Sequence, residues 1–158
     1  MPDQQYESDV LAWGEHQADL LRRLSRGEQV NEAPDWAHVI AEIEDVGLSE
    51  LRACRSLLVQ AMVRLLKLHL WPEAPSAAHW RGETAAFLAG ARRSFTASMR
   101  QRIDLQSLWL DALYELRAEA GQAALPALPE ACPLDLDRLI GERPDPMDLA
   151  ALLSSAKR

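Results

Sequence analysis

The fold is decided by one long segment between two prolines, residues 34–72, which reads PDWAHVIAEIEDVGLSELRACRSLLVQAMVRLLKLHLWP. Apolar or small residues recur in it at steps of three and four, which places them on one stripe of an α-helix. Pro34 suits a first helical turn and Pro72 ends the element, so we predict one long central helix, with a bend or break expected first at Gly47. The members of this seam are Trp36, Ile40, Ile43, Gly47, Leu51, Cys54, Leu58, Ala61, Leu65 and Leu68.

Shorter helical segments precede and follow this element. Good N-terminal caps are Ser8 or Asp9, Ser76, and Asp104 or Ser107, and Gly27 and Gly121 are typical helix stops. No strand pattern, internal repeat or linker between two cores is present. Residues 122–133 carry three prolines and are expected to form an extended strap. The predicted helices besides the central one cover residues 9–26, 76–102, 104–121, 135–140 and 145–154.

We therefore expect an all-α, up-and-down helical bundle of about four main helices, with a long central second helix and a short helical C-terminal extension. Residues 1–141 would form the bundle domain, and residues 142–158 would form the extension, as a short docking helix. Its apolar side would consist of Met147, Leu149, Leu152 and Leu153.

Composition and charge set limits on function. The chain has 158 residues, of which 48% are hydrophobic and 26% charged, as is usual for one globular domain. Its net charge of -7 argues against a dedicated nucleic-acid binder. The charge is uneven, because residues 1–50 hold 12 acidic and 3 basic side chains, whereas residues 51–102 hold 9 basic and 2 acidic ones. The basic part either pairs with the acidic parts or forms an anion site. The arginines that could form such a site are Arg52, Arg55, Arg92, Arg93, Arg100 and Arg102.

Targeting and cofactor signals are not found in the sequence. The N-terminus has no basic and apolar signal-peptide pattern, and no apolar run reaches the length of a bilayer, so we expect a cytoplasmic protein. Cys54 and Cys132 lack the spacing of metal ligands, although a disulfide between them stays open. We expect no cofactor and no catalytic nucleophile, because no glycine-rich phosphate loop or nucleophile motif occurs.

One cluster could hold a metal ion. His38, Glu42 and Asp45 follow one another at i, i+4 and i+7, which stacks them on one helical face. Carboxylate and imidazole ligands on bundle helices are typical of metal centres. The alternative is a solvated polar face opposite the apolar seam, which we favour because no second pair of ligands is evident.

Several motifs together resemble the DUF29 family over about residues 6–141. They are the segment 6–13 (YESDVLAW), the segment 40–50 (IAEIEDVGLSE), Leu65-Leu66-Lys67 with Trp71-Pro72, His79-Trp80-Arg81, and Cys132-Pro133. The resemblance implies a mostly helical bundle, found mainly in bacteria, to which no activity, cofactor or catalytic residue is attached. One departure is Arg64, since family members often have histidine three residues before the lysine that matches Lys67.

These observations predict a non-catalytic helical protein that acts through protein–protein contacts, with a protein partner or as a homo-oligomer. The alternative is a metal-dependent enzyme with a carboxylate and histidine site at His38, Glu42 and Asp45.

Overall fold

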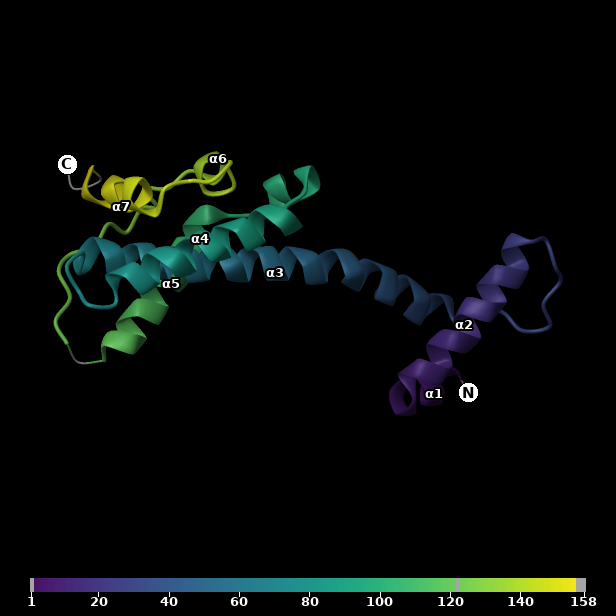
Figure 1. Cartoon of the computed structure of the whole chain (residues 1–158). Helices are drawn as coiled ribbons and strands as arrows, with labels where there is room; N and C mark the ends of the chain where they lie inside the picture. Colours follow the sequence, from purple (N-terminus) through teal and green to yellow (C-terminus); the bar gives the residue numbers. More distant parts are fainter. Residues whose placement is uncertain (1, 122, 156–158) are drawn as a thin grey trace. The chain divides into compact units, whose positions relative to one another are not determined.

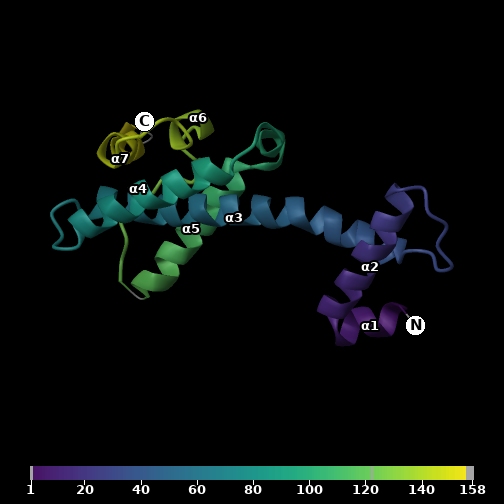
Figure 2. The same ribbon diagram turned by 45° about the vertical axis from the view of Figure 1, so that its right-hand side comes forward.

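The computed structural model describes residues 2–121 and 123–155, and every regular element in these residues is helical. Figures 1 and 2 show a long central helix, as predicted, and confirm the all-α class. Residues 1–49 and 50–158 form two compact units, called here the N-terminal and C-terminal units. The elements are α1 (Pro2–Ser8), α2 (Val10–Ser25), α3 (Trp36–Leu70), α4 (Ala77–Ser94), η1 (Ala97–Arg102), α5 (Leu105–Ala120), α6 (Leu136–Leu139) and α7 (Pro146–Ser155).

Helix α3 runs unbroken from Trp36 to Leu70, so it has no break at Gly47. A single interior glycine costs only about 1 kcal/mol relative to alanine, which good helix formers on either side can offset. The C-terminal end is as predicted, because Pro72 cannot continue the helix beyond Trp71.

The core of the C-terminal unit is built on the second half of the predicted seam. Cys54, Leu58 and Leu65 of α3 are fully buried and pack with Trp109 and Leu113 of α5. The Trp109 indole nitrogen donates a 2.8 Å hydrogen bond to the carbonyl of Pro129, which fixes the proline-rich strap against α5. Leu110 of the same helix is 50% exposed.

One of the predicted helix ends differs from the structure. Helix α4 ends at Ser94 instead of near Arg102, because Phe95 has an extended backbone (φ -67°, ψ 132°), and a short 3-10 helix, η1, follows. Helix α5 begins as predicted, since the Asp104 side chain accepts hydrogen bonds from the backbone N–H groups of Gln106 and Ser107.

The C-terminal helix α7 packs on its own unit. It contacts α4, and Leu149 and Leu153 are buried in the same core as α3 and α5. Asp145 accepts a 2.7 Å hydrogen bond from the backbone N–H of Met147, as expected for a cap before Pro146. Leu149 and Leu153 of α7 are thus covered within the chain, whereas Met147 is 39% exposed.

The N-terminal unit contains α1, α2 and the first half of α3. Helix α2 begins at its predicted cap, Asp9, and buries Trp13, Gln17 and Leu20 at i, i+4 and i+7. Val10 and Leu24 of the same helix are exposed. Helix α1 was not predicted, because seven mostly polar residues carry no apolar period.

Candidate functional site

Asp35 is the centre of a hydrogen-bonded cluster in the N-terminal unit. Its carboxylate accepts a 3.1 Å bond from the Trp13 indole nitrogen and lies 2.7 Å from Nδ1 of His38. It also receives the backbone N–H of His38 at 3.4 Å, which caps the start of α3. Burial raises the pKa of Asp35, but the bonds from His38 and Trp13 outweigh it, so the pKa lies below its usual value. The side chain is only 8% exposed and is held as a carboxylate.

Aromatic rings close this cluster on the side of α1. Tyr6 stacks on His38 with 4.0 Å between ring centroids and meets Trp13 edge-on at 4.8 Å. The Tyr6 hydroxyl donates a 2.6 Å hydrogen bond to Glu42, and this bond raises the pKa of Tyr6. These contacts join α1 and α2 to the first turns of α3, which is the structural role that the geometry supports.

The three candidate metal ligands lie on the same stretch of α3. His38 is engaged by Asp35 and Tyr6, and Glu42 accepts the Tyr6 hydroxyl. In residues 2–121 and 123–155, no three histidine, cysteine or acidic side chains are grouped closely enough to hold a metal ion. The metal site at His38, Glu42 and Asp45 stays a prediction.

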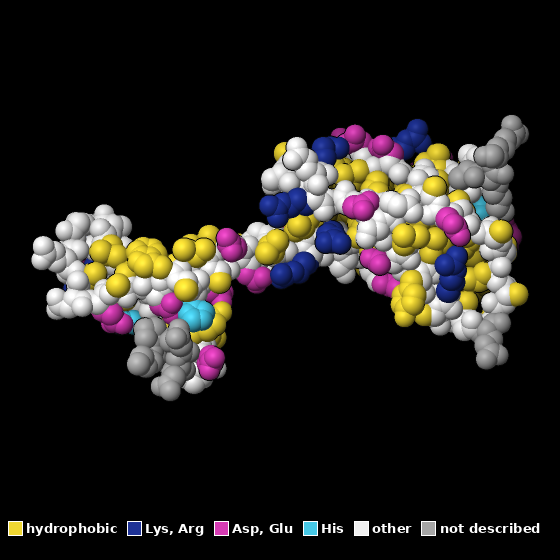
Figure 3. All heavy atoms as spheres, turned by 180° about the vertical axis from the view of Figure 1, so that it is seen from behind, with side chains coloured by type: hydrophobic (Ala, Val, Ile, Leu, Met, Phe, Trp, Pro, Cys, Tyr) yellow, Lys and Arg dark blue, Asp and Glu magenta, His cyan; other side chains and the backbone are white. Residues whose placement is uncertain are grey.

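A second feature of the N-terminal unit is an uncovered hydrophobic surface. Each residue from Ala41 to Ser49 is exposed. Ile43 and Val46 are 67% and 68% exposed, and Trp36 and Ile40 are about half exposed. Figure 3 shows hydrophobic side chains gathered on the surface of this unit. We call Trp36, Ile40, Ile43 and Val46 the α3 apolar face. The first three belong to the predicted seam, which was expected to be buried along the whole helix. That expectation is wrong for this half of α3.

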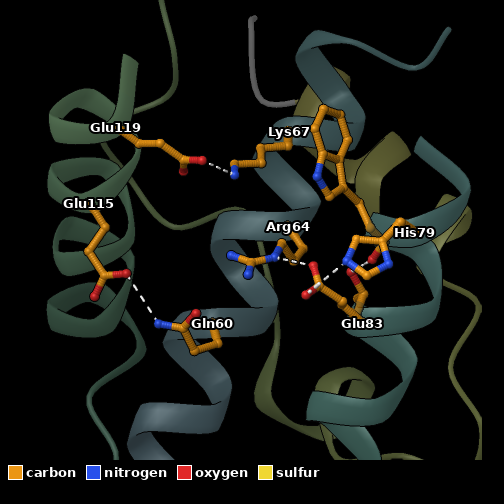
Figure 4. A network of polar contacts seen from close by, with 9 residues as sticks. Gln60, Arg64, Lys67, His79, Glu83, Glu115 and Glu119 are labelled. Atoms are coloured by element: carbon orange, nitrogen blue, oxygen red, sulfur yellow. Dashed lines mark hydrogen bonds and ion pairs between the residues drawn. The ribbon is translucent and has the colours of Figure 1, made fainter. Parts of the chain in front are cut away.

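A polar network occupies the C-terminal unit, where α3 passes between α4 and α5 (Figure 4). Lys67 of α3 is 10% exposed and donates a 2.5 Å bond to Glu119 of α5, while its ammonium lies 5.6 Å from the centre of the Trp80 ring. Arg64, one turn before it, forms a 2.6 Å ion pair with Glu83 of α4. This bond lowers the pKa of Glu83.

The Lys67–Glu119 and Arg64–Glu83 pairs were not predicted, since a sequence does not show which charged residues of different helices will meet. The charged groups of the network form ion pairs with one another, and these pairs join α3 to both α4 and α5. Arg64, where the family resemblance led us to expect histidine, pairs with Glu83 and is thus a structural cation in this chain.

Neither cysteine has the surroundings of a nucleophile. Burial raises the pKa of both thiols, and both are free in the structure. A thiol with a raised pKa stays protonated near neutral pH and reacts slowly.

None of the helices in the described part of the chain is long and apolar enough to span a lipid bilayer.

Comparison with known proteins agrees with the fold and gives no activity. A crystal structure of an α-helical protein of unknown function from Rhodospirillum rubrum ATCC 11170 is similar, with 36% sequence identity and a TM-score of 0.67. The similarity covers 94% of this chain and 96% of that one. No match is found among curated proteins. The domain of unknown function DUF29 matches residues 5–143, and the chain therefore belongs to the DUF29 family.

Proposed function

We propose that this chain is a non-catalytic helical protein that acts through protein–protein contacts, with the α3 apolar face as its contact surface. The observation that carries the proposal is the exposure of Ile43 and Val46 on a stretch of helix that is exposed along its whole length from Ala41 to Ser49. Most helical stability in proteins comes from packing an apolar face, so an uncovered stretch of this kind gains stability when a partner covers it.

The partner that fits this surface is an amphipathic helix whose apolar side is flanked by lysine or arginine. Between Trp36 and Ser49 the charged residues are Glu42, Glu44 and Asp45, with no lysine or arginine among them. A second copy of the same surface would bring like charges together, which is unfavourable across an interface. A basic amphipathic helix offers both the apolar contact and the opposite charge.

The test is a titration with synthetic helical peptides, followed by fluorescence anisotropy. One peptide carries a leucine seam with lysine flanks, the second the same seam with glutamate flanks, and the third is a scramble of the first. We expect the lysine-flanked peptide alone to bind, and its affinity to fall as salt rises. Equal binding of the scramble would show attraction by net charge alone and contradict the proposal.

Two surface variants give the matched comparison. Replacing Ile40 and Ile43 by glutamine should weaken peptide binding by about tenfold or more, because burial of each apolar side chain is lost. The control replaces Leu110 and Tyr114 of α5, which are also exposed, and should bind like the parent. If light scattering instead shows a dimer that the Ile40 and Ile43 changes abolish, the occupant is a second copy and the proposed partner is wrong.

The alternative function is a metal-dependent enzyme built on His38, Glu42 and Asp45. Asp35 contacts Nδ1 of His38 and the Tyr6 hydroxyl contacts Oε1 of Glu42, so Nε2 of His38 and the second carboxylate oxygen of Glu42 would be the ligand atoms. Calorimetric titration with Zn²⁺ tests it. Stoichiometric Zn²⁺ binding that is lost in Glu42→Gln would support a metal site. Absence of Zn²⁺ binding to the parent protein would contradict the metal-site hypothesis.

A further inference from the structure

The C-terminal unit contains a pocket of about 500 Å³ beside α4, which neither the polar network nor the α3 apolar face includes. Its size falls within the range of about 300–1,000 Å³ that is usual for small-molecule sites. One side is formed by α4, and the other by the residues that follow α6. Apolar atoms come from Ala85, Leu88, Ala89 and Pro144, and the remaining lining residues are Arg92, Arg93, Gly141 and Arg143.

Three arginines at this pocket lack an acidic partner. In the part of the chain that the structure describes, Arg92, Arg93 and Arg143 form no ion pair, whereas Arg64 and Arg100 each do. Like charges gathered at one pocket repel, so an anion there lowers the electrostatic energy of the unit. Guanidinium groups also match the planar geometry of a carboxylate, which they can bind through two parallel hydrogen bonds.

The backbone after α6 is shaped to form this wall. A side chain at Gly141 would place its Cβ 3.0 Å from the carbonyl oxygen of Asp137, so the close turn favours glycine. Arg143 follows with φ of 52°, in the left-handed region that non-glycine residues rarely adopt. Strained residues of this kind are concentrated at binding sites, where the surrounding structure holds them in place.

We propose that this pocket binds a small organic anion, namely a carboxylate attached to an apolar body. The arginines would receive the carboxylate, and the surface of Ala85, Ala89 and Pro144 would contact the apolar part. This goes beyond the proposed protein contact, since the pocket lies wholly in the C-terminal unit and the α3 apolar face in the N-terminal unit.

Calorimetric titration of the full chain with three probes tests both parts of the recognition. Octanoate carries the charge and the apolar body, 1-octanol has only the body, and inorganic phosphate has only the charge. We expect octanoate to bind with a stoichiometry of one, and each of the other two to bind at least about tenfold more weakly. Phosphate binding as tightly as octanoate would overturn the assignment of the apolar part, and failure of octanoate to bind would overturn the whole proposal.

Three variants locate the binding. Arg93→Gln and Ala89→Trp change exposed positions, so they should leave the thermal midpoint near that of the parent. The first should weaken octanoate binding by about tenfold through loss of a charged hydrogen bond, and the second should block the pocket. Arg81→Gln is the control, because it removes an exposed arginine of α4 outside the pocket. Equal losses in Arg93→Gln and Arg81→Gln would show that net charge alone is responsible, which would contradict the proposal.

Discussion

The indole nitrogen of Trp13 donates a 3.1 Å hydrogen bond to the carboxylate of Asp35, which lies 22 positions further along the chain. The same carboxylate is bonded to His38 at the start of α3. Gln17 of α2 adds a second link, since its side-chain oxygen accepts a 2.7 Å bond from the backbone N–H of Asp35. The orientation of α2 on α3 in the N-terminal unit therefore depends on one acidic residue that is both a helix cap and a buried acceptor.

Acid should loosen this junction. The pKa of Asp35 is lower in the folded protein than in the unfolded chain, so the folded state binds fewer protons there. Its contribution to stability is thus complete above the unfolded pKa of about 4 and is lost as pH falls through the folded value. The Trp13 indole N–H resonance should shift in this acid range. In Asp35→Asn this acid-dependent shift should be absent; an unchanged titration would contradict the assignment.

Replacing Gly47 by alanine should stabilise α3. A Cβ added at Gly47 meets no atom within 4 Å, so the change improves helix propensity without a clash. We expect amide exchange of residues 41–49 to slow by a factor that corresponds to about 1 kcal/mol. Gly14→Ala in α2, which also has free space, is the control and should leave exchange in residues 41–49 unchanged. Faster exchange in Gly47→Ala would show that α3 is not a continuous helix there.

The Lys67–Glu119 pair should respond unequally to loss of its two members. Lys67 is buried and Glu119 is mostly exposed, so Glu119→Gln leaves a buried ammonium without its acidic partner. We expect that change to lower the free energy of unfolding by about 1–3 kcal/mol. Lys67→Met should cost less than about 1 kcal/mol, because Glu119 can turn to solvent and methionine fills similar space. Urea unfolding of both variants measures the difference, and a larger loss in Lys67→Met would contradict the account.

The Arg64–Glu83 pair gives a second prediction for acid. Since the bond from Arg64 lowers the pKa of Glu83, Arg64→Gln should raise that pKa toward its usual value. The stabilisation from this pair is present above the unfolded pKa and is lost as pH falls through the lower folded one. A carboxyl-carbon NMR titration of Glu83 in the parent and the variant measures both values. An identical pKa in the two proteins would show that the pair does not form in solution.

The sequence predicted helices better than it predicted what covers them. Helix starts at Asp9 and Asp104 were found because capping is local chemistry, which a few neighbouring residues decide. The seam of α3 was also found, but Leu58 is fully buried whereas Ile43 is 67% exposed. Periodicity identifies an apolar face and does not say whether the chain itself covers it. The exposed half of the α3 seam therefore points to a surface that the chain itself leaves uncovered.

Pairings between helices were the part that the sequence could not supply. Arg92 and Arg93 were expected either to pair with acidic residues or to join an anion site. Arg143, which completes the pocket, carried no signal because it lies 50 positions from Arg93 and depends on a turn at Gly141. Such groupings depend on tertiary packing, which local patterns do not encode.

The most direct test of the proposed contact surface is hydrogen exchange measured by mass spectrometry, with and without the lysine-flanked amphipathic peptide. In the free protein, residues 41–49 should exchange much faster than residues 54–68 of the same helix, because only the latter are packed in a core. The account predicts that the peptide slows exchange in residues 36–49 and leaves α5 unchanged. Protection confined to the C-terminal unit, or none on α3, would contradict the claim that the α3 apolar face is the contact surface.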